Sequence, residues 1–172
     1  MTPAPIIETE RLLLRGPEAR DLDAHIGFYA TERADWVGGR QDARNAWRGF
    51  AAAIGHWHVL GFGFWMVTRK GDDRCIGRVG CLFPEAWPER EIGWTLFEAE
   101  GQGYAFEAAQ AVRAHAYRAL GWTTAVSYIA PANIRSQRLA ERLGCVRDSE
   151  AVPLPFADVD VWRHPAPAEL AA

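Results

Sequence analysis

The sequence predicts an α+β domain in which helices pack against one β-sheet. Three observations support this class. Apolar and polar residues alternate along most of the stretch from Phe62 to Phe97, which is typical of successive strands. Helical spacing of apolar residues comes before and after these strands. The length of 172 residues, 49% of them hydrophobic, suits one domain that buries its own core.

The first part of the chain is predicted to form a strand and two helices. Leu12 and Leu14 alternate with arginines, as in a half-buried strand. Pro17 opens a helix, and after a polar loop at 33–41, Asp42 caps a second helix. An apolar stripe marks this second helix, and it consists of Ala43, Ala46, Trp47, Phe50, Ala51 and Ile54.

The rest of the chain alternates between predicted strands and helices. A hairpin turns at Gly71, a long helix runs from Gly103 to Leu120, and a short helix follows from Asn133 to Leu143. The expected strands are 62–69, 74–83, 90–97, 122–130, 146–152 and 157–162. The predicted order is therefore β-α-α-β-β-β-α-β-α-β-β. One domain spans 6–164, and the Pro/Ala-rich segments 1–5 and 165–172 are expected to be flexible ends.

Charge and hydropathy exclude several classes of protein. A net charge of −3 and a pI near 6.0 give no basic surface for direct nucleic-acid binding. The longest apolar stretch, Val59–Val67, is too short to span a membrane. Cys75, Cys81 and Cys145 are odd in number and widely spaced, which favours buried reduced thiols. With no secretory signal visible, the expected location is cytoplasmic.

The most informative segment is a strand that runs through a glycine-rich turn directly into a helix, residues 91–109. The first amides of a helix lack intrahelical acceptors and lie at its positive end. The absence of side chains at Gly101 and Gly103 allows an anion such as phosphate to approach them. A plain turn that only needs positive φ remains the alternative. The P-loop pattern is absent, and Phe106 replaces the third glycine of a dinucleotide-binding motif.

A second polar pair begins the next helix. Asn133 and Ser136 are three residues apart at its start. Such spacing suits an N-cap, in which Asn133 accepts from the amide of residue 136. The alternative is that both polar groups face a ligand held by the preceding helix, which requires neighbouring strands before the two helices.

Together these two segments resemble one family. The segment EIGWTL…GQGYAFEAA, followed by PANIRSQRLAERLGC, is similar to the GNAT N-acetyltransferases, specifically the RimJ/RimL-like branch. The resemblance spans nearly the whole chain, including the opening IIETERLLLR. It implies a mixed, mostly antiparallel sheet with helices on both faces. It also implies acetyl-CoA as co-substrate, with no metal.

The resemblance implies a role for each matching position. The cofactor-binding residues would be Trp94, Thr95, Leu96, Gly101, Gln102, Gly103, Tyr104, Ala105, Asn133 and Ser136. Backbone amides of the glycine turn would hold the pyrophosphate, and the strand before it would pair with pantetheine. An amide near Leu96 would polarise the thioester carbonyl. Ser136 would lie near the sulfur and protonate or hydrogen-bond the leaving thiolate. This chain departs from the family at Glu100, an acid in place of Gln or Arg, and its turn is about one residue shorter.

Acetyl transfer also needs a neutral amine. A protein α-amine, with a pKa of about 7.7–8.0, is partly neutral at pH 7, whereas a lysine-type amine near 10.4 needs a base. The candidate base is Glu91, acting directly or through a water. The alternative is a structural carboxylate paired with Arg90 or Arg78.

The acceptor site is expected to come from the two early helices and the loop between them. The acceptor itself is expected to be an amine-bearing small molecule or a protein N-terminus. Trp36 would form a wall of this site and Asp35 would attract a cationic amine; the alternative for Trp36 is a tryptophan at the edge of the core. Among the other tryptophans, Trp47 and Trp122 are expected in the core and Trp65 near the acceptor. His56 and His58 are expected at a helix end rather than on a metal, and the strand after Gly144 offers an edge for a homodimer.

Overall fold

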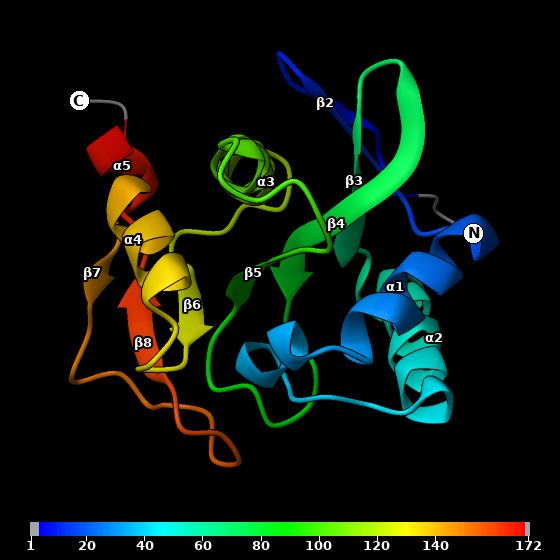
Figure 1. Ribbon diagram of the computed structural model, residues 1–172. Coiled ribbons are helices and arrows are strands. Elements are labelled where there is room, and N and C mark those ends of the chain that lie inside the picture. Colours follow the sequence, from blue (N-terminus) through cyan, green and yellow to red (C-terminus); the bar gives the residue numbers. More distant parts are fainter. Residues whose placement is uncertain (1–3, 171–172) are drawn as a thin grey trace.

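A computed structural model describes residues 4–170 and shows one eight-stranded sheet in the order β1-β2-β3-β4-β5-β6-β8-β7 (Figure 1). Its strands are β1 (Ile7–Glu8), β2 (Leu12–Arg15), β3 (Phe64–Arg69), β4 (Asp72–Leu82), β5 (Glu91–Leu96), β6 (Val126–Ile129), β7 (Val146–Arg147) and β8 (Asp160–Arg163). Neighbouring strands are antiparallel except β5 and β6, which are parallel. The prediction of a mixed, mostly antiparallel sheet is therefore confirmed.

Helices cover both faces of this sheet (Figure 1). They are α1 (Leu22–Tyr29), α2 (Ala43–Leu60), α3 (Tyr104–Arg118), α4 (Ile134–Arg142) and α5 (Pro167–Leu170), with 3-10 turns η1 (Ala19–Asp21) and η2 (Glu32–Trp36). On one face, Phe28 of α1 and Phe50 of α2 pack with Met66 of β3. On the other face, Val112 of α3 and Ala140 of α4 join the main core. The sheet thus separates α1 on one face from α3 and α4 on the other.

Several element boundaries differ from the predicted ones. The first helix begins at Leu22, because Glu18 and Asp21 form a capping box around the 3-10 turn that precedes it. The predicted strand at 122–130 is shorter, since only Val126–Ile129 pairs with β8. The last two predicted strands are also reduced, to β7 and β8. The chain adds β1 and the short helix α5, which the sequence pattern did not indicate.

Two tryptophan predictions are wrong. Trp47 is 55% exposed, because α2 buries the face that carries Ala46, Phe50 and Trp57 instead. Trp65 is fully buried. It contacts Trp57 near the end of α2 and His115 of α3, on the side of the sheet away from α1. Trp122 is buried as predicted.

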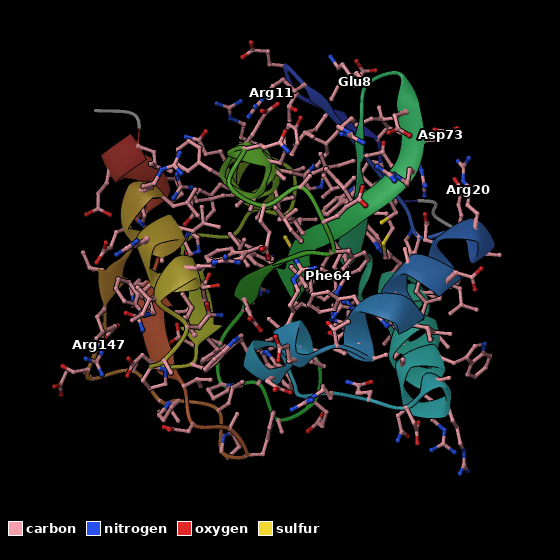
Figure 2. The ribbon with its side chains drawn as sticks, in the orientation of Figure 1. Glu8, Arg11, Arg20, Phe64, Asp73 and Arg147 are labelled. Atoms are coloured by element: carbon pink, nitrogen blue, oxygen red, sulfur yellow. The ribbon has the colours of Figure 1, made fainter. Side chains whose placement is uncertain are left out.

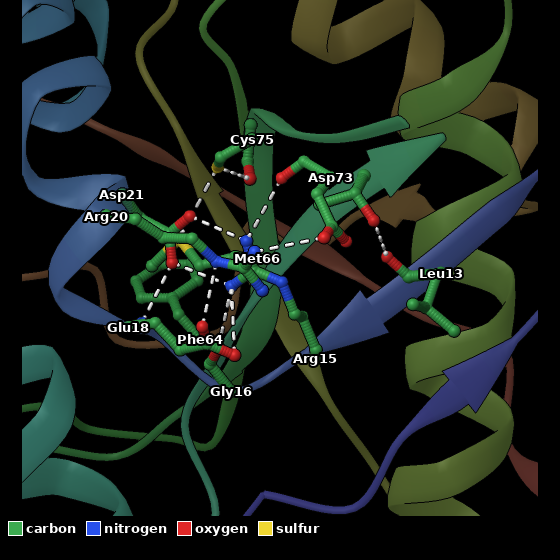
Figure 3. A network of polar contacts seen from close by, with 12 residues as sticks. Leu13, Arg15, Gly16, Glu18, Arg20, Asp21, Phe64, Met66, Asp73 and Cys75 are labelled. Carbon is green, nitrogen blue, oxygen red and sulfur yellow. Dashed lines mark hydrogen bonds and ion pairs between the residues drawn. The ribbon is translucent and has the colours of Figure 1, made fainter. Parts of the chain in front are cut away.

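A buried ion pair fixes the start of α1 to the sheet. Arg15 of β2 donates two hydrogen bonds of 2.8 Å to the carboxylate of Asp21 (Figure 3). Asp21 also accepts from the Glu18 amide, and Arg20 donates to Asp73 at the start of β4. Because both partners of the Arg15 pair are buried, removal of one would leave an uncompensated charge. This pair therefore sets where the start of α1 lies on the sheet.

The cysteines are buried and free, as predicted. Burial raises the pKa of the Cys75 thiol to about 11, so it stays protonated near neutral pH.

The expected flexible ends include residues 1–3 and 171–172, which lie outside the described residues. Within residues 4–170, the carbonyls of Pro5 and Pro165 accept hydrogen bonds from Trp65 and Tyr117. In that same range, no helix is long and apolar enough to cross a membrane.

Candidate active site

The parallel strands β5 and β6 pair at one position and then separate. Glu91 is opposite Val126, while β5 keeps six register pairs with β4 on its other side. The hydroxyl of Ser127 donates to the carbonyl of Ile92 at 2.6 Å, in place of a further backbone bond between the strands. Beyond Ile92, the β6-facing edge of β5 therefore has no strand partner within residues 4–170.

A buried chain of hydrogen bonds supports the gap that begins between β5 and β6 after Ile92. His164 contacts Ser127 through Nε2 at 3.0 Å and Arg113 of α3 through Nδ1 at 3.4 Å. Burial lowers the pKa of His164 to about 3, so the ring is neutral. Since Ser127 uses its proton on Ile92, Nε2 of His164 donates and Nδ1 accepts from Arg113. Nothing in the sequence pattern singled out Arg113, Ser127 or His164, because they come together only in three dimensions.

The edge of β5 beyond Ile92 lines a cleft of about 970 Å³. Its walls come from η2, β5, the glycine turn, α3 and α4. The cleft brings together the following predicted residues: Asp35, Trp36, Trp94, Thr95, Leu96, Gly101, Ala105, Asn133 and Ser136. Gln102, Gly103, Tyr104 and Glu91 do not line it.

The glycine turn has the backbone conformation that its residues suggested. Gly101 and Gly103 both have φ of +81°, and Gly103 begins α3 with no side-chain cap. A Cβ on Gly101 would meet no atom within 4 Å, so the space beside this turn is open. The turn is therefore suited to bind an anion through backbone amides, without a basic side chain of its own.

Arg11, which lies at the hairpin of β1 and β2 (Figure 2), holds the glycine turn by hydrogen bonds and is not among the residues that line the cleft. It donates to the carbonyl of Gln102 at 2.9 Å and to the carboxylate of Glu107 at 2.7 Å. Its guanidinium also lies over the Tyr104 ring, with 4.7 Å between Cζ and the ring centroid. The Gln102 carbonyl and the Tyr104 ring thus face Arg11.

The start of α4 has the expected N-cap, and both Asn133 and Ser136 also line the cleft. The Asn133 side chain accepts from the Ser136 amide at 3.2 Å, which confirms the N-cap. Because the cap uses Oδ1, the Nδ2 amide of Asn133 remains able to donate to a ligand. The indole of Trp94 donates to Oγ of Ser136 at 3.2 Å, so the Ser136 proton points away from Trp94.

Glu91 lies where β5 and β6 are still paired, on the face of the sheet that carries α1 and α2. Its Oε2 accepts from the Trp87 indole at 2.6 Å, and Oε1 lies over Gly93, 3.5 Å from where a Cβ would stand. Burial raises the pKa of Glu91 to about 7, although the Trp87 hydrogen bond and the charge of Arg78 act in the opposite direction. Within the described residues no Arg lies at ion-pair distance from it. A buried carboxyl of this kind can accept and release a proton near neutral pH.

The residues expected at the acceptor lie at the mouth of the cleft. Trp36 is 48% exposed and lines it, as does Asp35. The carboxylate of Asp35 accepts from Arg40 at 2.9 Å, so its charge is partly neutralised. His56 and His58 on α2 contact backbone groups near the end of that helix. No group of three or more metal-ligating side chains occurs in the described part of the chain.

Comparison with known proteins agrees with this arrangement. Residues 11–146 match the acetyltransferase (GNAT) domain. An acetyltransferase from Agrobacterium tumefaciens is 38% identical, with a TM-score of 0.89 over 94% of each chain. A GNAT-family acetyltransferase from Bacillus anthracis is 22% identical, with a TM-score of 0.74 over 93% of this chain and 96% of that one.

The ribosomal L7/L12 α-N-protein acetyltransferase RimL, in complex with coenzyme A, shares the fold. It is 20% identical, with a TM-score of 0.70 over 95% of this chain and 99% of that one. The fold and the family match thus define the chain as an acetyltransferase. This chain belongs to the GNAT acetyltransferase family, and its structural neighbours include proteins of the RimJ/RimL-like branch.

Proposed function

We propose that this chain is an N-acetyltransferase that transfers the acetyl group of acetyl-CoA to a primary amine by direct attack in a ternary complex. The acceptor is a protein N-terminus or a small-molecule amine. The observation that carries the proposal is the open edge of β5, which is continuous with an uncapped glycine turn and with Ser136 in one cleft. Acetyl-CoA fits this set, since its diphosphate suits the turn and its extended amide arm suits a strand edge.

Each residue has a proposed task in the transfer. Acetyl-CoA supplies a thioester carbonyl as the acetyl donor. Backbone amides near Leu96 donate to that carbonyl, and Asn133 donates to the pantetheine arm through Nδ2. Glu91 takes a proton from the amine, directly or through a water, from the α1/α2 face of β5. From the other face, which carries α3 and α4, Ser136 donates a hydrogen bond to the leaving thiolate, or passes it a proton that Ser136 regains from solvent.

The pKa of Glu91 favours an α-amine as acceptor. With a pKa of about 7, Glu91 is half ionised at neutral pH. An α-amine of pKa about 7.7–8.0 differs from it by roughly one unit, whereas a lysine amine near 10.4 differs by more than three. Trp36 provides an aromatic wall at the mouth for the group that carries the amine, and Asp35 provides negative charge.

Thermal unfolding with acetyl-CoA tests the binding half of the proposal. Saturation at about 100-fold the Kd stabilises a protein by about 2.7 kcal/mol, which corresponds to a rise in Tm of about 5–10 °C for a chain of this size. No rise at millimolar acetyl-CoA contradicts the proposal. A screen over peptides with free N-termini, polyamines, aminoglycosides and amino-acid analogues then identifies the acceptor.

A catalytically weak CoA-binding or partner-binding module on the same fold is the second candidate, and Glu100 favours it. This carboxylate lies in the cleft beside the glycine turn, where it opposes a bound phosphate. A module of this type shows a rise in Tm with acetyl-CoA and no turnover with any amine. Cytoplasmic location and homodimer formation through the edge strand β7 remain predictions.

Substitution of Ser136 separates turnover from binding. Ser136→Ala is expected to lower kcat about 10- to 100-fold, because the thiolate loses its proton donor. The Kd for acetyl-CoA, measured by calorimetry, is expected to stay within about threefold, since the Asn133 cap uses only the backbone amide of residue 136. Ser149→Ala, outside the cleft, is the control and leaves both quantities unchanged. An unchanged kcat in Ser136→Ala removes the proposed role.

A further inference from the structure

Glu100 joins two segments that are far apart in the sequence. Its Oε1 accepts from Nη2 of Arg33 in η2 at 2.7 Å, and its Oε2 accepts from Nη1 of Arg135 in α4 at 2.5 Å. All three side chains line the cleft. Glu100 therefore connects the acceptor-side segment η2 with the first turn of α4, and it does so directly before Gly101 of the glycine turn.

Arg33 extends this contact to the open edge of β5. It donates to the carbonyl of Leu96 at 2.9 Å and to the carbonyl of Phe97 at 2.5 Å. Its guanidinium also lies over the Phe28 ring, 5.3 Å from the centroid. The guanidinium thus occupies the end of the strand edge at which an extended ligand arm would pair.

The cleft concentrates positive charge in an otherwise acidic protein. Arg33, Arg135, Arg138 and Arg142 line it, against Glu32, Asp35 and Glu100, whereas the whole chain carries −3. Guanidinium groups bind carboxylate and phosphate oxygens with the same planar geometry. A carboxylate that two arginines share is therefore a chemical substitute for a phosphate group.

We propose that Glu100 is an internal anion that holds Arg33 and Arg135 until the diphosphate of acetyl-CoA replaces it. The inference rests on the proposed function for the identity of this ligand. Glu100 and both arginines are at least one-third exposed, so water screens their pairs and the exchange costs little. Release of Arg33 also frees the carbonyls of Leu96 and Phe97 for the pantetheine amides. Phosphate binding and pairing of the arm with β5 are thereby coupled.

Calorimetry with three ligands tests the exchange: acetyl-CoA, acetyl-pantetheine, which has no phosphate, and inorganic diphosphate. Glu100→Gln is expected to bind acetyl-CoA and diphosphate about 3- to 10-fold more tightly, since the competing charge is gone. Acetyl-pantetheine is also expected to bind more tightly to this variant, because Arg33 no longer has a partner that keeps it over the β5 edge. Glu141→Gln, the same change on α4 outside the cleft, is the control and leaves all three affinities unchanged.

Arg135→Ala is expected to change the affinity for phosphate-bearing ligands in the opposite direction. Its affinity for acetyl-CoA and diphosphate is expected to fall about 5- to 10-fold, and its affinity for acetyl-pantetheine is expected not to fall. The loss is expected to be larger in the Glu100→Gln background, where Arg135 has no competing partner. Arg118→Ala at the end of α3 is the control. Arg135 is 82% exposed, so neither variant is expected to unfold the protein.

The outcomes distinguish a failure of the exchange at Glu100 from a failure of the proposed function. Tighter acetyl-CoA binding in Glu100→Gln with no effect of Arg135→Ala means that Glu100 only repels phosphate, and it overturns the exchange. Unchanged or weaker binding in Glu100→Gln also overturns it. Diphosphate binding that follows these signs while acetyl-CoA fails to bind supports the exchange site and contradicts the proposed function.

Discussion

Glu91→Gln is expected to lower kcat about 100-fold or more, because general-base catalysis is lost while the shape of the side chain is kept. In the wild-type protein, kcat/KM is expected to rise with pH through about 7, since the carboxyl must be ionised to accept a proton. The variant is expected to lose this rise. An acceptor amine of pKa below about 6 keeps the titration of the substrate out of the measured range.

Stability provides a second measurement on the same variant. The folded-state pKa of about 7 lies above the ordinary 4.5, so the folded protein binds this proton more tightly than the unfolded chain. The contribution is therefore fully present below about pH 4.5 and is lost as pH rises to 7, with a total of about 3 kcal/mol. Glu91→Gln removes this loss, so its free energy of unfolding at pH 8 is expected to be no lower than that of the wild type.

Glu85→Gln is the control for both measurements, because Glu85 is exposed in the loop before β5. It is expected to leave kcat, the pH profile and stability unchanged. A Glu91→Gln variant that keeps the wild-type kcat and pH profile contradicts the role of Glu91 as base. It would then be a structural carboxylate that accepts from Trp87.

Gly101→Val is expected to weaken acetyl-CoA binding about 100-fold. In the free protein its Cβ meets no atom within 4 Å, so no packing clash arises. In the complex, the side chain occupies the space through which a phosphate reaches the backbone amides. Calorimetry with acetyl-CoA measures the loss directly.

Gly71→Val is a closely matched control for this substitution. Gly71 in the turn between β3 and β4 also has φ of +81°, and a Cβ there also meets nothing within 4 Å. Both variants therefore carry similar backbone strain of about 1–2 kcal/mol and a comparable fall in Tm. Acetyl-CoA affinity is expected to fall only in Gly101→Val. Equal affinities in the two variants contradict a phosphate site at the glycine turn.

Local patterns in the sequence were sufficient for the elements and for the two helix starts. Alternation located β3, β4 and β5 to within two residues, and Asp42 and Asn133 cap their helices as predicted. These predictions succeed because capping, turn conformation and periodicity depend on residues within one or two turns of each other. The same patterns misplaced Trp47 and Trp65, because an apolar stripe does not specify which neighbour covers it.

The sequence by itself determined the fold class, the glycine turn with its open backbone, and the order of the two helix starts that resembles the GNAT family. Only the tertiary structure decided how β5 is held apart from β6, through Ser127 and His164, and that Glu100 is shared by Arg33 and Arg135. It also decided the raised pKa of Glu91. The physical reason is that desolvation and charge pairing depend on groups distant along the chain, which contribute only once the sheet and helices have brought them into contact.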